Sequence, residues 1–300
     1  MLQPLQELDE ALLVRVLRDQ YGASGHALEF MPVGEDSWSY RLDDLWVSVR
    51  RDLRGHFPEA YETVSRLREL GNESLLAPLA GSDGKAVREV CGHPVVVFPY
   101  VLAAPVAVPP GPGELDQVIA VLSRLHRSRP DTDPGVEDYA LSFEDDLDRA
   151  VDQASATGPD SGPYSTRVRR LIRRNHDRVA SLRSELKDLA ALCLASDEPR
   201  VLTHGEPHPG NILRPVDGGG LLLVDWTELR WGPPERDWYH VISSFGAGPR
   251  CRPEFFRYYE IRWWLSEFAE YATWFLGDHV DGEEEPGMWE RMTCYFPEVG

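Results

Sequence analysis

One segment of the chain carries more chemical information than any other. It reads Val201-Leu202-Thr203-His204-Gly205-Glu206-Pro207-His208-Pro209-Gly210-Asn211-Ile212-Leu213, and Leu221-Leu222-Leu223-Val224-Asp225-Trp226 follows it. An acidic side chain at Glu206 precedes the amide of Asn211 by five positions, and the second apolar run ends at Asp225. The Pro and Gly residues favour a tight loop, and the Gly-rich turn at 217–220 favours a hairpin. We therefore expect Glu206 and Asn211 in one loop and Asp225 at the end of a rigid strand.

These three polar side chains suit phosphoryl transfer. That reaction requires a protein mainly to position the reactants and to neutralise charge. Glu206 would accept the proton of an attacking hydroxyl, while the amide oxygen of Asn211 and the carboxylate of Asp225 are hard ligands that suit Mg²⁺. His204 and His208 are expected to hydrogen-bond the loop backbone rather than bind a metal, because no further ligand lies at metal-site spacing.

Composition and charge narrow the class of protein. The chain has 300 residues, 42% of them hydrophobic, which is enough for one large domain or two lobes around a cleft. A net charge of −19 argues against nucleic-acid binding and would attract a cationic ligand, although it also favours solubility. No run of about 18 apolar residues predicts a membrane span, and the N-terminus lacks the pattern of a signal peptide. With four scattered cysteines, which we expect to be reduced, the protein is predicted to be cytoplasmic.

The spacing of apolar residues predicts two lobes. Residues 1–98 read as a small, β-rich, N-terminal lobe, and residues 103–300 as a mostly helical lobe. A hinge is expected at about 97–102. The helices that we expect are 5–21, 58–70, 114–127, 141–153, 165–194, 235–244 and 253–276.

The segment from His204 to Trp226 resembles the motif of the aminoglycoside phosphotransferases, a kinase-like family of small-molecule kinases. The family's pattern is His-Gly-Asp, then His and Gly-Asn, and later Ile-Asp-Trp. The resemblance implies an α+β, bilobal protein-kinase-like fold. In that fold residues 1–98 would form the nucleotide-binding lobe, and residues 103–300 would carry the catalytic loop, the metal site and the acceptor pocket. It also implies that Glu206 is the catalytic residue and that Asn211 and Asp225 bind Mg²⁺.

The residues that follow the motif are similar to the spectinomycin-phosphotransferase branch in particular. They read Asp225-Trp226-Thr227-Glu228 and then Gly232-Pro233-Pro234-Glu235-Arg236-Asp237-Trp238. By this resemblance Asp237 would anchor the helix behind the site. The alternative is that Asp237 is only a charge at a helix N-terminus, where the helix dipole favours it.

Two positions depart from the family's pattern. Glu206 stands where the family has Asp, and its extra methylene would move the carboxylate by about 1.5 Å. Ser48, on the third strand, is placed at the position of the phosphate-binding lysine. Because strand side chains alternate, Arg50 shares a face with Ser48 and would supply the charge, with Glu59, or else Glu62, as its ion-pair partner. The alternative is that Arg50 is a solvated strand charge.

The resemblance also places the nucleotide. Adenine would lie beside Phe98, Tyr100 and Val101 and would hydrogen-bond the backbone there. The turn at 32–37 lies where a loop would cover the phosphates, but it has one Gly and two carboxylates, which disfavours tight binding. Mg²⁺ is the expected cofactor, with ATP or GTP as the phosphoryl donor.

A stripe of side chains on the helix at 253–276 is predicted to bind the acceptor. Its members recur at i, i+3 or i+4 spacing, and aromatic rings that alternate with carboxylates suit a cationic, sugar-like ligand. The alternative is a core-facing helix with carboxylates at its boundary. Glu228 is also assigned to the acceptor side. The stripe comprises Phe256, Glu260, Trp264, Glu267, Tyr271 and Trp274.

Together these features predict a nucleotide-dependent O-phosphotransferase. Its acceptor would be a hydroxyl of a small polar, cationic molecule, such as an aminoglycoside or aminocyclitol antibiotic or a related natural product. Neither nucleic acid nor a membrane is an expected partner, and the protein is expected to be a monomer or homodimer. One alternative is a catalytically impaired pseudokinase that binds a nucleotide or metabolite, because Ser48 and Glu206 both depart from the pattern. Another keeps the fold but changes the reaction, for example to a primary-metabolite kinase.

Overall fold

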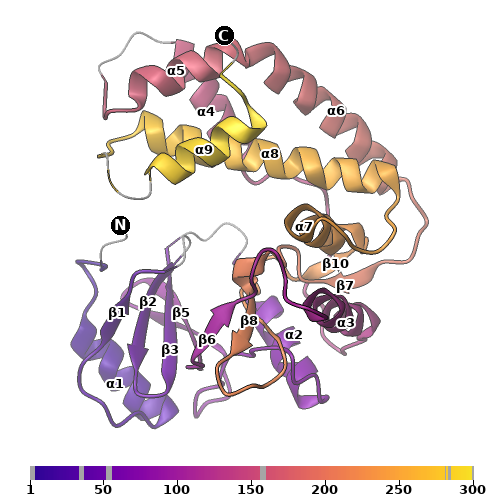
Figure 1. The fold of residues 1–300 in the computed structure, drawn as a ribbon. Coiled ribbons are helices and arrows are strands. Elements are labelled where there is room, and N and C mark those ends of the chain that lie inside the picture. Colours follow the sequence, from indigo (N-terminus) through magenta and orange to yellow (C-terminus); the bar gives the residue numbers. More distant parts are fainter. Residues whose placement is uncertain are drawn as a thin grey trace. The chain divides into compact units, whose positions relative to one another are not determined.

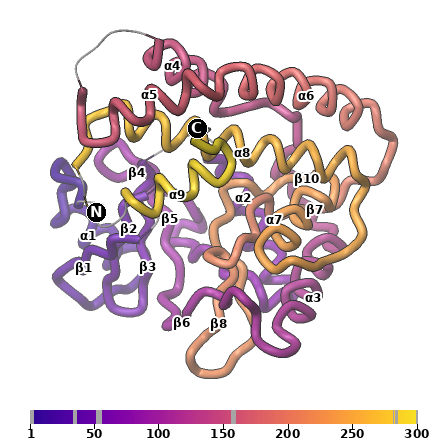
Figure 2. Tube along the Cα trace, turned by 45° about the horizontal axis from the view of Figure 1, so that its top comes forward, coloured from indigo at the N-terminus to yellow at the C-terminus, as the bar shows by residue number. Residues whose placement is uncertain are grey.

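A computed structural model describes residues 4–33, 37–51, 56–155, 160–280, 282 and 285–298. Contacts within the chain divide it into two compact units (Figures 1 and 2). The first unit comprises Leu2–Glu137 and Pro199–Arg250, and the second comprises essentially Asp138–Glu198 and Cys251–Gly300. Each unit is described by itself. The lobe boundaries at 98 and 103 stay a prediction.

A five-stranded antiparallel sheet forms the N-terminal part of the first unit (Figure 1). Each strand pairs with its neighbour in a continuous register, and Ser48 of the third strand lies between Ser39 and Val96. Asp43 takes a positive φ of 52° in the two-residue turn between the second and third strands. In spatial order the strands are β1 (Glu29–Met31), β2 (Ser37–Leu42), β3 (Leu45–Arg50), β5 (His93–Pro99) and β4 (Val87–Val90).

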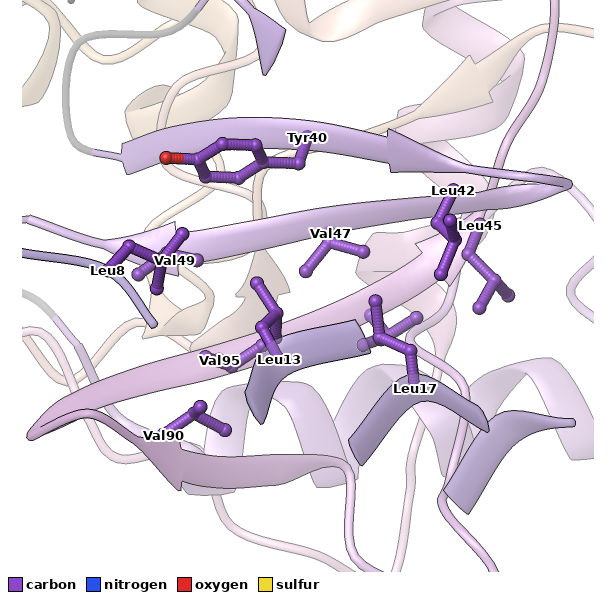
Figure 3. Close-up of a cluster of buried hydrophobic side chains, with 11 residues drawn as sticks. Leu8, Leu13, Leu17, Tyr40, Leu42, Leu45, Val47, Val49, Val90 and Val95 are labelled. Carbon is purple, nitrogen blue, oxygen red and sulfur yellow. The ribbon is translucent and has the colours of Figure 1, made fainter. Parts of the chain in front are cut away.

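Helix α1 (Glu10–Tyr21) covers one face of this sheet. Its Leu13 and Leu17 are fully buried and lie against Val47 and Val95 in the cluster drawn in Figure 3. The helix begins at Glu10 rather than at Leu5, because the side chain of Asp9 caps it by accepting a hydrogen bond from the amide of Leu12 at 2.9 Å. The other face of the sheet therefore carries Ser48 and Arg50.

The rest of the first unit carries the sequence motif. A three-stranded sheet has the order β6-β8-β9, and a two-stranded sheet pairs β10 with β7. A single 3₁₀ turn (Pro209–Asn211) precedes β8. The predicted hairpin at 212–225 is present, but its second strand ends at Leu223, two residues before Asp225. The remaining elements are α2 (Pro58–Glu69), β6 (Ala103–Pro105), α3 (Glu114–Arg127), β7 (Val201–Thr203), β8 (Ile212–Pro215), β9 (Leu222–Leu223), β10 (Arg230–Gly232) and α7 (Glu235–Phe245).

The second unit is helical. Its longest helix, α8 (Pro253–Leu276), packs against the four others, and the expected bounds of α8 are those observed. The other helices are α4 (Glu144–Ser155), α5 (Ser165–Arg174), α6 (His176–Leu194) and α9 (Glu285–Tyr295). Among the described residues, no helix is long and apolar enough to cross a membrane.

One expectation for this unit was wrong, and one helix was not predicted. The single helix expected at 165–194 is broken at Asn175, whose side-chain amide donates to the carbonyl oxygens of Leu171 (3.0 Å) and Pro297 (3.3 Å). Helix α9 was not expected, since its first turn contains Pro286 and Gly287. Of these contacts, the bond from Asn175 to Pro297 joins residues far apart in the chain.

Candidate active site

The loop of residues 204–211, which is predicted to be catalytic, is held by its own histidines. The His204 Nε2–H donates to the carbonyl oxygen of Val224 (2.8 Å), while Nδ1 accepts from the amide of Glu206 (3.3 Å). His204 is completely buried, and burial lowers the pKa of its imidazole, so the ring is neutral with the proton on Nε2. His208 Nδ1 accepts from the amide of Gly210 (3.1 Å). The prediction that both histidines bond the backbone is confirmed.

Asn211 is fixed with one end of its amide toward the loop. The side-chain Nδ2 of Asn211 donates to the backbone carbonyl oxygen of Glu206 (3.0 Å). The backbone carbonyl oxygen of Asn211 accepts from the amide of Val224 (3.1 Å). Because Nδ2 binds the loop, the side-chain oxygen Oδ1 is the end of the amide that suits a cation. The bond to Val224 brings Asn211 beside the residue that precedes Asp225.

Asp225 lies on a strained but well-anchored backbone. Its φ is +65°, a left-handed conformation that is uncommon outside glycine. The residues on either side are tethered, Val224 through His204 and Trp226 through a bond from its Nε1 to the carbonyl oxygen of Leu76 (2.8 Å). The carboxylate is exposed, and one oxygen accepts from the hydroxyl of Thr227 (3.1 Å). An exposed, rigidly placed carboxylate beside an oriented amide oxygen suits a hard divalent cation.

Asp237 clamps the loop from behind. This fully buried carboxylate at the start of α7 accepts from the amides of His204 (3.1 Å) and Gly205 (2.7 Å) and from Nε2 of His126 (2.7 Å). Burial alone would raise the pKa of Asp237, but the hydrogen bond and charge of His126, with His204 and the Gly205 amide, outweigh it and lower the pKa. Asp237 therefore ties the start of α7 to the loop.

Arg236 forms a second clamp beside the first. It is fully buried and donates from Nε to Glu137 (2.7 Å), from Nη2 to the carboxylate of Glu228 (2.6 Å), and from Nη1 to the hydroxyl of Thr203 (3.2 Å). Gly205 has a φ of +102°, and a Cβ there would lie 2.4 Å from Nη1 of Arg236. The loop therefore needs glycine at this position. Glu228 is bound to this clamp, and its predicted role in acceptor binding stays a prediction.

The charges of Arg50, on β3, and of Glu59, on α2, both act on the imidazole of His56. Arg50 is only 4% exposed, so it is not the solvated strand charge of the alternative interpretation. Burial lowers the pKa of His56, the charge of Arg50 lowers it further, and the charge of Glu59 raises it. Arg50 and Glu59 thus lie within electrostatic range of the same group. Glu59 itself is exposed in the first turn of α2.

The predicted adenine site is a cluster of partly buried aromatic residues. The ring of Tyr100 stacks on Trp46, with centroids 6.4 Å apart, and the guanidinium of Arg41 lies 4.0 Å above it. The amide of Tyr100 donates to the backbone carbonyl oxygen of Asp44 (2.7 Å). The next backbone amide that could donate to a base is therefore that of Val101. Phe98 contacts Tyr61 of α2 edge-on. Of the predicted phosphate-covering turn, Gly34–Asp36 lie outside the described residues.

The predicted acceptor stripe on α8 is already engaged by side chains of the second unit. Glu260 accepts from Arg257 (2.6 Å), and the guanidinium of Arg257 lies 5.2 Å from the ring of Trp264. Tyr271 is buried and donates to Glu267 (2.8 Å). These contacts favour the interpretation of a packed helix face at Tyr271, whereas Glu260, Trp264 and Glu267 remain partly exposed. Their role in acceptor binding stays a prediction.

Sequence reasoning missed two residues that support the site. His126, at the end of α3, hydrogen-bonds the carboxylate of Asp237, and Glu137 forms an ion pair with Arg236. Both lie about 100 residues from their partners in the chain, so no local pattern identifies them. Within the described parts of the chain, no group of three or more His, Cys, Asp or Glu side chains is arranged to hold a metal ion.

Comparisons with known proteins agree with this geometry. The solved spectinomycin phosphotransferase APH(9)-Ia, in complex with ADP and spectinomycin, matches 97% of this chain and 95% of its own, with a TM-score of 0.73 at 16% identity. An amicoumacin kinase in complex with AMP-PNP, Ca²⁺ and Ami matches 98% of this chain and 95% of its own, with a TM-score of 0.60 at 12% identity. These likenesses confirm the predicted kinase-like α+β fold.

The sequence comparisons extend this result from fold to family. Protein StrN of Streptomyces griseus is 45% identical over 280 residues, which cover 90% of this chain and 86% of that protein. Residues 34–274 match the phosphotransferase enzyme family. The prediction of a small-molecule phosphotransferase is thereby confirmed at the level of the family. The chain belongs to the phosphotransferase enzyme family.

Proposed function

We propose that this protein transfers a phosphoryl group from a magnesium–nucleotide to a hydroxyl of a small, polar, cationic molecule. One observation carries the proposal: the bonds from Val224 to Asn211 and from His204 to Val224 fix Asn211 and Asp225 beside each other. Asn211 and Asp225 would hold a Mg²⁺ ion through two hard oxygen donors, and the ion would neutralise charge on the phosphates. Glu206 lies in the same loop and accepts the proton of the attacking hydroxyl.

The nucleotide is supported by two kinds of observation. Solved structures of similar fold hold ADP or AMP-PNP, and this chain places Phe98, Tyr100 and Val101 after β5 in a partly buried aromatic setting. Either ATP or GTP fits a site that reads the base through backbone groups. Mg²⁺ is the cation whose chemistry matches the donor set of one amide and one carboxylate.

Arg50 supplies the positive charge on the β3 side. Ser48 is placed at the position of the kinase lysine, and Arg50 lies two residues further along β3, on the same face of the sheet. The charge of Glu59, which acts on His56 as that of Arg50 does, would orient the guanidinium, as the ion pair of a kinase orients its lysine.

The acceptor is proposed from charge and from the relatives. The chain has a net charge of −19, and the partly exposed carboxylates and ring of Glu260, Glu267 and Trp264 suit a cation. The likeness to a spectinomycin phosphotransferase and an amicoumacin kinase supports an antibiotic or a related natural product as acceptor.

Thermal unfolding with ATP and with GTP, each with and without Mg²⁺, tests this function. A ligand at 100 times its dissociation constant stabilises a protein by about 2.7 kcal/mol. We expect a Mg²⁺-dependent shift that Asp225→Asn abolishes, while Asp217→Asn, a matched change on an exposed turn, preserves it. The absence of any shift at millimolar nucleotide in the wild type would overturn the proposal.

Turnover separates the kinase from the pseudokinase. The substitution Glu206→Asp restores the carboxylate of the family pattern, so a screen of cationic acceptors should show retained or increased phosphoryl transfer. A magnesium–nucleotide shift without turnover in either protein, with every acceptor, would favour the pseudokinase.

A further inference from the structure

Two serine side chains lie side by side on the face of the five-stranded sheet that α1 does not cover. Ser39 of β2 and Ser48 of β3 are directly opposite each other in the register of the two strands. Their neighbours in the chain, Tyr40, Val47 and Val49, belong to the core cluster that packs against α1 (Figure 3). Because side chains alternate along a strand, both serines point to the other face, with Cβ atoms about 5 Å apart.

Neither serine hydroxyl has a hydrogen-bond partner among the described residues. Ser39 is 2% exposed and Ser48 is 9% exposed, and polar groups in such buried residues nearly always have a partner. Neither oxygen is among the unpartnered atoms that the described protein encloses completely, so a bound molecule can reach both. Two reachable hydroxyls without a partner, on adjacent strands, indicate a ligand that forms hydrogen bonds.

The two serines form a row of small side chains between larger ones. Trp46 lies opposite Phe98 on one side of this row, and Arg50 lies on the other side. Successive rows on one face of a sheet are two residues, or about 7 Å, apart. A nucleotide with its base beside Phe98 and its terminal phosphates toward Arg50 therefore passes over the serines. The α-phosphate is the first phosphate after the ribose, so it is the group that lies over the row.

The charge of the strands indicates that this ligand group is an anion. Although the chain has 50 Asp and Glu residues, none of them belongs to β2, β3 or β5. The same face of these strands carries the guanidinium groups of Arg41 and Arg50. Hydroxyls that donate to a charged oxygen form stronger hydrogen bonds than those that donate to a neutral one. A phosphate suits this face better than an amine does.

We propose that Ser39 and Ser48 donate hydrogen bonds to the α-phosphate of the donor nucleotide. The inference rests on the proposed function and adds Ser39 to the residues that hold the nucleotide. Where a kinase has one lysine on its third strand, this chain then has two neutral hydroxyls on neighbouring strands and takes the charge from Arg50. AMP, ADP and ATP all carry the α-phosphate, whereas adenosine lacks it.

Calorimetric titration of the full-length protein with AMP and with adenosine tests the inference. We expect Ser39→Ala with Ser48→Ala to weaken AMP binding at least about tenfold, since two hydrogen bonds to a charged group are lost. Adenosine binding should stay unchanged. Ser128→Ala with Ser155→Ala is the matched double variant, because its hydroxyls bond carbonyl oxygens of their own helices, α3 and α4. It should bind AMP as the wild type does.

Urea denaturation without nucleotide separates ligand binding from a role in packing. Because neither hydroxyl has a partner within the described protein, the change to alanine should leave the urea midpoint unchanged or raise it. A lowered midpoint with undiminished AMP binding would assign the serines to the fold and overturn the inference.

Two further outcomes would contradict the inference, and a third concerns the proposed function. Equal AMP affinity in the serine double variant and the wild type would overturn the inference, while ATP binding by the wild type would still support the proposed function. An equal loss of adenosine and AMP affinity would place the hydroxyls at the base or ribose and overturn the assignment to phosphate. A wild type that bound neither AMP nor magnesium–ATP would overturn the proposed function itself.

Discussion

The catalytic loop and the α8 stripe both present acidic side chains, but they hold them by different means. Around the loop, Asp237 is bound by two backbone amides and one buried imidazole. On α8, Glu260 is bound by the half-buried Arg257, which also reaches Glu185. A fully buried, backbone-bound carboxylate costs much to disturb, whereas a partly exposed ion pair costs little. The difference suits a rigid reaction site and an exchangeable binding face.

The largest effect is expected from removal of the loop clamp. Asp237→Ala would leave the donors of His126, His204 and Gly205 buried without an acceptor. Removal of one partner from such a buried charged network costs about 3–5 kcal/mol. Urea denaturation should show this loss of stability, and Asp217→Ala on an exposed turn should show almost none. A loss below about 1 kcal/mol would mean that the loop does not depend on Asp237.

Gly205→Ala should give the next largest loss of stability. The new Cβ would meet Arg236 at 2.4 Å and Glu228 at 2.6 Å, on a backbone with a φ of +102°. Backbone strain and overpacking each cost about 1–3 kcal/mol. Gly218→Ala is the matched control, because its φ is +87° and nothing lies within 4 Å of the added carbon. Urea denaturation of both variants measures their losses of stability, and the difference between the losses gives the cost of the contact with Arg236 apart from that of the backbone strain. Equal losses would contradict the tight packing of Arg236 against residue 205.

A smaller, pH-dependent effect is expected at His204. Burial lowers the folded-state pKa of His204, the charge of Arg236 lowers it too, and Asp237, Asp225 and the carbonyl of Val224 raise it. Its contribution to stability is therefore complete above the unfolded pKa of about 6.5 and is lost as the pH falls below that value. Protonation of Nδ1 would also break the bond from the amide of Glu206.

The pH dependence of urea midpoints between about pH 7.5 and 5.5 measures this effect. His56 has a lowered pKa as well, so its loss has the same sign. The variant His56→Asn removes that contribution and leaves the slope due to His204. Carboxylates such as Asp237, whose pKa is lowered, titrate below this window. A midpoint independent of pH in His56→Asn would contradict a neutral, buried His204.

The sequence was sufficient to predict the structure of segments whose residues contact their neighbours in the chain. Glu206, Asn211 and Asp225 were predicted in one hairpin-linked motif, and the observed bonds join residues 204, 206, 211 and 224 within it. The helix of Pro253–Leu276 was also predicted with its observed bounds. In these segments, proline, glycine and apolar spacing determine the local backbone, so pattern and structure agree.

The sequence was not sufficient to predict features that depend on a hydrogen-bond partner from a distant segment of the chain. The break at Asn175 depends on Pro297, and the coordination of Asp237 depends on His126. For the α8 stripe, spacing alone does not separate a binding face from a packed face. Arg291 of α9, a helix that was not predicted, donates to Tyr271 and covers part of it. Such pairings follow from tertiary packing, which single-sequence periodicity does not contain.

The smallest effect on stability, and the sharpest test of the stripe, is expected from Glu260→Gln. Glu260 and Glu185 both bind Arg257, at 2.6 Å and 2.8 Å, but only Glu260 belongs to the stripe. Because all three side chains are partly exposed, loss of either carboxylate should cost less than about 1 kcal/mol. If the stripe binds a cationic acceptor, Glu260→Gln should raise the KM for the acceptor with little change in kcat, since it removes binding common to ground and transition states. Glu185→Gln should leave KM unchanged. An equal KM in both variants would identify the stripe as a packing surface, and the acceptor would then have to be sought elsewhere.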